Sequence, residues 1–107
     1  GLAIASAIKG YKCIFVLPDK MSSEKIRNLR AFGARVVVTP TAVEPDDPRS
    51  YYCVSKRLAQ ETPNSAYMNQ YNNTANRDCH EAYTGPEIEK QFPNVDAIVA
   101  GIGTGGT

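Results

Sequence analysis

The chain has 107 residues, 42% of them hydrophobic, which is enough for one compact core. Its 12 Lys and Arg residues and 11 Asp and Glu residues leave a net charge of +1, so neither nucleic acid nor an anionic membrane is indicated as a partner. No apolar run approaches the roughly 20 residues of a membrane span, and no signal peptide is evident, so we expect a cytoplasmic protein. The odd number of widely spaced cysteines (Cys13, Cys53, Cys79) favours reduced thiols over disulfides or a zinc site.

Strand-like and helix-like segments alternate in the first part of the chain. Apolar β-branched runs indicate buried strands, while serines and glycines mark the helix ends. In chain order, the pattern predicts a helix over 1–9, a strand over 12–17, a helix that begins at Ser22 or Ser23 and ends at Gly33, a strand over 35–39, and a helix from Tyr51 to about Pro63.

Shorter elements follow: strands over 66–68 and 97–100, and helices over 74–79 and 86–91. Strands separated by helices predict right-handed crossovers and a parallel sheet. We therefore expect an α/β protein, a three-layer αβα arrangement with a parallel sheet of about four strands, forming one domain over residues 1–107. Because the chain opens on Gly1 and stops inside a loop, we also expect it to be part of a longer polypeptide.

The glycine-rich segment 101–107, directly after the last predicted strand, is the best clue to function. Gly103, Gly105 and Gly106 let successive backbone N–H groups turn inward, and the hydroxyls of Thr104 and Thr107 add donors. This composition predicts an anion site that suits a phosphate. A plain glycine turn is the structural alternative, and a dinucleotide-binding loop is another, since residues 101–106 also satisfy G-x-G-x-x-G.

A second candidate is the amide-rich segment 69–73, which follows the predicted strand over 66–68. Its Gln70 can donate to a carboxylate, and Tyr71 can pack on an apolar side chain while its hydroxyl stays in water. An Asx-rich loop that caps the next helix is an equally good interpretation.

Other reactive residue types have simpler explanations. Cys79 and His80 are adjacent on a predicted helix, where neighbours point about 100° apart and do not readily share a metal ion. The lysines that suggest themselves for a Schiff base, Lys20, Lys25 and Lys56, lie in or beside polar helices without an apolar pocket. We therefore expect neither a metal site nor a catalytic lysine in this chain.

Taken together and in order, the motifs resemble the fold type II β-replacement enzymes that use pyridoxal phosphate. The resemblance covers nearly the whole chain and is carried by Pro18-Asp19-Lys20-Met21-Ser22-Ser23-Glu24-Lys25, Leu29-Arg30-Ala31-Phe32-Gly33-Ala34, Thr39-Pro40-Thr41, Asn69-Gln70-Tyr71-Asn72-Asn73 and Gly101-Ile102-Gly103-Thr104-Gly105-Gly106-Thr107. Residues 21–25, 47–50, 63–65 and 70–71 are more similar to the cystathionine β-synthase branch, whereas 83–88 and 100–102 look more like cysteine synthase.

The resemblance implies a role for each matching position. Gly103, Thr104, Gly105, Gly106 and Thr107 match the loop that binds the phosphate of pyridoxal 5'-phosphate, Gln70 the residue that holds the substrate carboxylate, and Tyr71 its neighbour facing the second substrate. The Schiff-base lysine is expected before Gly1, so the chain alone is expected to be inactive. It would be the smaller, mobile domain of a homodimeric core that joins serine to a thiol such as homocysteine. A dinucleotide-binding module and a non-catalytic regulatory domain remain alternatives.

Overall fold

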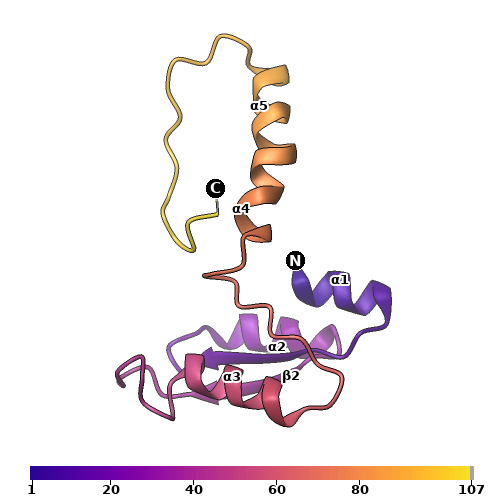
Figure 1. Ribbon diagram of the computed structural model, residues 1–107, viewed down its shortest axis with the longest axis vertical. Helices are drawn as coiled ribbons and strands as arrows, with labels where there is room; N and C mark the ends of the chain where they lie inside the picture. The colour runs from indigo at the N-terminus through magenta and orange to yellow at the C-terminus, as the bar shows by residue number, and fades with distance from the viewer. Residues whose placement is uncertain (107) are drawn as a thin grey trace. The chain divides into compact units, whose positions relative to one another are not determined.

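A computed structural model describes residues 1–106 of the chain. In chain order its elements are α1 (Leu2–Lys9), β1 (Ile14–Pro18), α2 (Ser23–Ala31), β2 (Arg35–Thr39), α3 (Tyr51–Glu61), α4 (Ala75–Cys79), a π-helical segment η1 (His80–Thr84) and α5 (Gly85–Gln91) (Figure 1). Contacts divide the chain into two compact units: a first unit, Gly1–Tyr67, and a second unit from Met68 onward. The predicted single-domain organisation stays a prediction.

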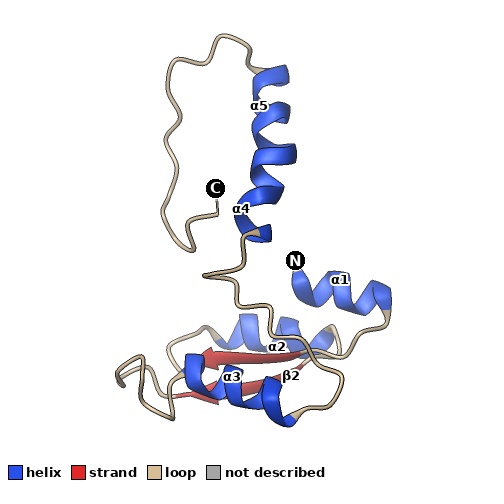
Figure 2. Ribbon diagram, viewed as in Figure 1, coloured by secondary structure: helices blue, strands red, loops and turns tan. Residues whose placement is uncertain are grey.

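The first unit is built on a parallel pair of strands. Ile14 of β1 pairs with Arg35 of β2, and the register continues to Pro18 and Thr39. Helix α3 contacts β1 and helix α2 contacts β2, and Figure 2 shows α3 in front of the strands and α2 behind them. The unit is therefore an α/β structure with helices on both sides of its sheet, as the alternation of segments predicted.

Local sequence explains where these helices begin and end. Ser22 and Ser50 cap α2 and α3, each accepting a hydrogen bond from the backbone N–H three residues later. Gly10 ends α1 with φ of 74°, a left-handed conformation that glycine adopts without strain. Both capping serines have extended backbone, which separates each helix from the segment before it.

The second unit contains one continuous helical stretch where the sequence predicted two separate helices. The segments α4, η1 and α5 follow one another without a break from Ala75 to Gln91. Pro86 lies inside this stretch, directly after the π-helical segment η1, where the Gly85 N–H already bonds to the carbonyl of His80 in place of the usual α-helical partner, so its missing N–H is accommodated without separating the helices. Across the π-helical turn, His80 Nδ1 and Thr84 Oγ1 lie 2.9 Å apart in a hydrogen bond.

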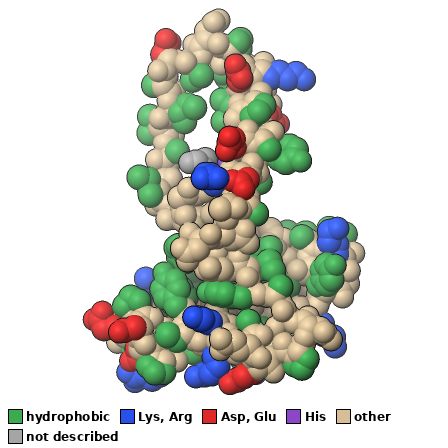
Figure 3. All heavy atoms as spheres, viewed as in Figure 1, with side chains coloured by type: hydrophobic (Ala, Val, Ile, Leu, Met, Phe, Trp, Pro, Cys, Tyr) green, Lys and Arg blue, Asp and Glu red, His purple; other side chains and the backbone are tan. Residues whose placement is uncertain are grey.

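The described sheet has two strands rather than the predicted four or so. Residues 66–68 and 97–100 are not strands, because neither segment has a neighbouring strand among the described residues to pair with its backbone groups. Val99 is 98% exposed, and Figure 3 shows apolar side chains on the surface of the second unit. The apolar run over 97–100 is thus present but unburied. Within residues 1–106, no helix has the length and apolar character needed to cross a membrane.

Candidate functional site

The amide-rich segment 69–73 forms a tight turn held by its own asparagines. The carbonyl of Asn69, whose φ is 44°, accepts hydrogen bonds at 2.9 Å from the backbone N–H groups of both Asn72 and Asn73. Asn73 Nδ2 donates to the carbonyl of Met68 at 3.0 Å, and its Oδ1 accepts from the N–H of Ala75 at 3.0 Å. The asparagines therefore have the structural role of the alternative interpretation, an Asx-rich loop that leads into a helix.

Gln70 and Tyr71 lie at the outside of this turn. Both side chains are exposed, and no hydrogen bond within residues 1–106 engages the carboxamide of Gln70. An exposed carboxamide on a turn that other side chains hold in place is well suited to donate to a ligand.

The glycine loop, residues 101–106, presents free backbone to solvent. Gly105 has φ of 77°, and a Cβ at Gly101, Gly103 or Gly105 would meet no atom within 4 Å. Among the described residues, no backbone hydrogen bond engages the N–H groups of this loop. Thr107, the last residue predicted for this site, lies outside the described residues.

Asn76, in the first turn of α4, brings the turn and the loop together. Its Nδ2 donates to the backbone carbonyl of Gln70 at 3.4 Å and to Thr104 Oγ1 at 3.1 Å. Because each segment follows a predicted strand of one parallel sheet, the sequence predicts that both lie at the carboxyl edge of that sheet. Neither predicted strand is present among the described residues, and the structure joins the two segments through an asparagine side chain. Sequence reasoning misses Asn76 because nothing in its local sequence indicates a contact with a residue 28 positions later.

The remaining candidates lie apart from this arrangement. Lys20, Lys25 and Lys56 are exposed and belong to the first unit. The thiol of Cys79 donates to the carbonyl of Asn76 at 3.2 Å, while His80 contacts Thr84. Within residues 1–106, no three His, Cys, Asp or Glu side chains come together to hold a metal ion. The hollow bordered by Gln91, Phe92, Pro93, Asn94 and Val95, about 300 Å³, includes neither the turn nor the loop.

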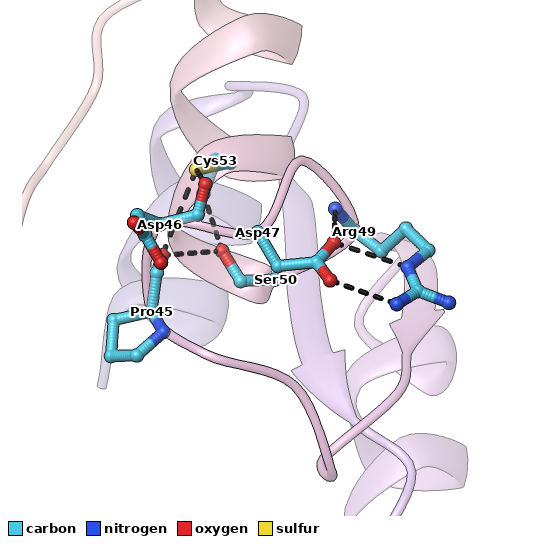
Figure 4. A network of polar contacts seen from close by, with 6 residues as sticks. All are labelled: Pro45, Asp46, Asp47, Arg49, Ser50 and Cys53. Atoms are coloured by element: carbon cyan, nitrogen blue, oxygen red, sulfur yellow. Dashed lines mark hydrogen bonds and ion pairs between the residues drawn. The ribbon is translucent and has the colours of Figure 1, made fainter.

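A second polar network, before α3, is structural (Figure 4). Ser50 Oγ, on a residue that is only 2% exposed, donates to the carbonyl of Pro45 at 2.8 Å and accepts from the N–H of Cys53 at 3.2 Å. Asp47 accepts from Arg49 Nε and Nη2 at 3.1 and 2.8 Å. The hydrogen bonds from the Arg49 side chain are the main reason that the pKa of Asp47 falls from 3.8 to about 2. These contacts fix the start of helix α3.

The chemistry of the glycine loop fits a phosphate group. The loop combines N–H groups that no described backbone group engages, glycines without Cβ atoms at 103 and 105, and a threonine hydroxyl, which are the features that an anion site needs. Because Thr104 Oγ1 accepts from Asn76, its own proton is left to donate outward. The neighbouring carboxamide of Gln70 suits a second, carboxylate-bearing ligand.

Comparison with known proteins defines the class. The sequence matches the family described as "Pyridoxal-phosphate dependent enzyme" over residues 1–107. It is 48% identical to cystathionine β-synthase of Saccharomyces cerevisiae, covering 100% of this chain and 22% of that protein. It is 45% identical to a probable cysteine synthase of Bacillus subtilis, covering 100% of this chain and 35% of that one. The crystal structure of O-acetylserine-dependent cystathionine β-synthase from Helicobacter pylori superposes with a TM-score of 0.87 at 37% identity, over 98% of this chain and 34% of the other.

The first unit is thus a two-strand α/β structure, and the second unit carries the glycine loop, in a chain that is related over its whole length to cofactor-dependent enzymes. The chain belongs to the family of pyridoxal-phosphate-dependent enzymes. It spans about a fifth of the length of the cystathionine β-synthases it matches. Membership over the whole chain overturns the alternative of a dinucleotide-binding module, even though G-x-G-x-x-G is present.

Proposed function

We propose that this chain is part of a β-replacement enzyme of the cystathionine β-synthase type, which joins L-serine and L-homocysteine to form cystathionine. The observation that carries the proposal is the joining of two binding segments by Asn76: a loop suited to phosphate and a turn that presents Gln70. The similarity to cystathionine β-synthases along the full chain supports the choice of reaction.

Each predicted site residue has a defined task in this proposal. The N–H groups of Gly103, Gly105 and Gly106 and the hydroxyl of Thr104 hold the phosphate of pyridoxal 5'-phosphate. The part of Thr107 in this loop stays a prediction. Gln70 donates its carboxamide N–H to the substrate carboxylate, and Tyr71 faces the incoming thiol. These residues bind and orient, and the lysine that carries the cofactor is expected before Gly1.

Pyridoxal phosphate, held by Gly103, Gly105, Gly106 and Thr104, would supply the electron sink that exchange of the β-substituent of serine for a thiol requires. The residues of this chain hold the two ends of the reacting assembly. The loop fixes the phosphate, and Gln70 fixes the carboxylate. Since both are anchored to one unit, the amino acid is aligned with the cofactor before the reaction begins. The remainder of the catalytic core and a second subunit are the further partners that we propose.

Cysteine synthase is the second candidate for the reaction. The Bacillus subtilis relative is named a probable cysteine synthase. The Helicobacter pylori enzyme is named a cystathionine β-synthase, but its description as O-acetylserine-dependent favours the amino-acid substrate of this second candidate. The candidates differ in the leaving group, hydroxyl or acetate, and in the nucleophile, homocysteine or sulfide. Measuring kcat/KM of the complete enzyme for serine with homocysteine and for O-acetylserine with sulfide distinguishes them, and we expect the first pair to be preferred.

Two variants of the complete enzyme test the binding roles. Gly105→Leu forces a side chain into φ of 77° and into the space for the anion, so bound pyridoxal phosphate should fall. Gln70→Ala removes a hydrogen bond to a charged group, about 1.5–3 kcal/mol, so the apparent affinity for serine should fall roughly 10- to 150-fold while bound cofactor stays. Both quantities are measured from cofactor absorbance, before and during a serine titration.

The opposite pattern would contradict the assignment. Loss of cofactor in Gln70→Ala together with normal cofactor content in Gly105→Leu would mean that the roles of the two segments are exchanged. Unchanged cofactor and serine binding in both variants would show that this chain does not line the active site.

A further inference from the structure

Asn76 contacts both halves of the candidate site through one side-chain amide. Its Nδ2 donates to the carbonyl of Gln70 and to the hydroxyl of Thr104. The residue is half-buried and belongs to the first turn of α4, so its backbone is fixed by a helix while its side chain reaches two irregular segments. A single side chain therefore links the turn that presents Gln70 to the loop that contains Thr104.

Gly106 shows how closely the loop fits around this side chain. A Cβ on Gly106 would lie 2.5 Å from Asn76 Oδ1 and 2.8 Å from its Cγ, closer than real Cβ atoms approach. The φ of Gly106 is outside the left-handed region, so backbone conformation does not require glycine there. The missing side chain instead makes room for the carboxamide of Asn76. For Gly105 the reverse holds. Its φ of 77° favours glycine, whereas a Cβ there would meet no other atom within 4 Å.

From these contacts we propose that Asn76 is a positioning residue that couples the phosphate loop to the carboxylate-binding turn. Phosphate in the loop orients the Thr104 hydroxyl, the hydroxyl holds the Asn76 carboxamide, and the carboxamide holds the carbonyl of Gln70. Binding at one segment thereby orders the other, so the affinities for pyridoxal phosphate and for the amino acid rise together. This inference rests on the proposed function and adds a coupling residue to it.

The test is a set of variants of the complete enzyme with two readouts: pyridoxal phosphate affinity of the apoenzyme, and serine affinity of the holoenzyme. Asn76→Ala removes one neutral hydrogen bond to each segment, so each affinity should fall roughly 2- to 12-fold. Gly106→Ala should give a similar loss, because its Cβ displaces the Asn76 side chain. The double variant Asn76→Ala/Gly106→Ala should be no worse than the more severe single variant, since both changes break the same contacts.

Gly105→Ala is the matched control. Gly105→Ala lowers the affinities through backbone strain, which does not involve Asn76. In the double variant Asn76→Ala/Gly105→Ala, the two losses of affinity should therefore be additive. Thr104 provides an independent arm if Asn76→Ala folds poorly. Thr104→Val removes the acceptor for Asn76 and also the hydroxyl proposed to hold the phosphate, so pyridoxal phosphate affinity should fall further than in Asn76→Ala, while serine affinity, which reports the coupling, should fall as it does in Asn76→Ala. Thr104→Ser keeps the hydroxyl and should restore most of both affinities. A merely structural role for Asn76 would lower the melting temperature and leave the two affinities and this pattern unchanged.

Additive losses in Asn76→Ala/Gly106→Ala, or unchanged affinities in Asn76→Ala, would overturn the coupling role. The comparison with Gln70→Ala and Gly105→Leu separates this failure from failure of the proposed function. If those two variants show the expected losses and Asn76→Ala does not, only the coupling is wrong. If none of them shows a loss, the proposed site itself is wrong.

Discussion

Single residues at helix starts illustrate how burial changes the contribution of one interaction. Ser22 and Ser50 are both N-cap serines, but Ser22 is exposed and its hydroxyl is 3.4 Å from the N–H of Lys25, whereas Ser50 is buried and also donates to Pro45. Water can replace the contacts of the exposed serine. It cannot easily reach those of the buried one, so the two otherwise similar residues should differ in their effect on stability.

We predict that Ser50→Ala lowers the free energy of unfolding by about 1–2 kcal/mol, since it removes a helix cap and leaves the carbonyl of Pro45 without its hydroxyl donor. Ser22→Ala, the matched control, should lower it by only about 0.5 kcal/mol. Urea denaturation followed by circular dichroism measures both. An equal or larger loss in Ser22→Ala would show that burial does not set the difference.

Asp47 gives a prediction about pH. Its folded pKa of about 2 is below the ordinary 3.8, so ionised Asp47 stabilises the folded chain above pH 3.8, and this contribution is lost as the pH falls through about 2. Arg49→Ala should return the titration midpoint towards 3.8, because the hydrogen bonds from Arg49 are the main cause of the shift. NMR titration of the Asp47 carboxyl carbon measures this. Arg57→Ala is the control. It removes a different ion pair, between Arg57 Nε and Glu61 Oε1 at 3.9 Å, and should leave the titration midpoint of Asp47 unchanged.

At the scale of elements, local sequence predicted well what depends on neighbouring residues. The strand over 35–39, the helix that begins at Ser22 or Ser23 and the helix from Tyr51 were confirmed, because β-branched runs, a capping serine and helical spacing act within a few residues. The strand over 97–100 depends on a partner strand, which no local pattern supplies. The helices over 74–79 and 86–91 were predicted apart, whereas the structure joins them through the π-helical segment His80–Thr84, which no local pattern indicates.

The exposed apolar run over 97–100 leads to a prediction about pairing. Two β-branched residues of this run, Ile98 and Val99, are 67% and 98% exposed, which is unfavourable for a segment whose composition suits a buried parallel strand. In the complete enzyme we expect this run to pair with a neighbouring strand, so the amides of both residues should exchange hydrogen slowly. In the isolated 107-residue chain they should exchange quickly. Equally fast exchange in both forms would mean that the run is a loop in the enzyme as well.

At the scale of the whole molecule, the candidate site depends on the second unit alone. Gln70, Asn76 and the described part of the glycine loop all belong to it, while the parallel strands belong to the first unit. Composition predicts the glycine loop and the Gln70 turn as binding segments, and these two assignments stay predictions. Their connection could not be predicted, because it depends on the placement of Asn76 by a helix and on a missing Cβ at Gly106, both of which are properties of the folded chain.

The most direct test of the central claim is a crystal structure of the complete enzyme with pyridoxal phosphate and L-serine bound. We predict that phosphate oxygens lie within hydrogen-bonding distance, about 2.7–3.2 Å, of loop N–H groups between Gly103 and Gly106, and that the serine carboxylate lies at such a distance from Gln70 Nε2. A phosphate held by another segment, with the glycine loop turned away from the cofactor, would contradict it.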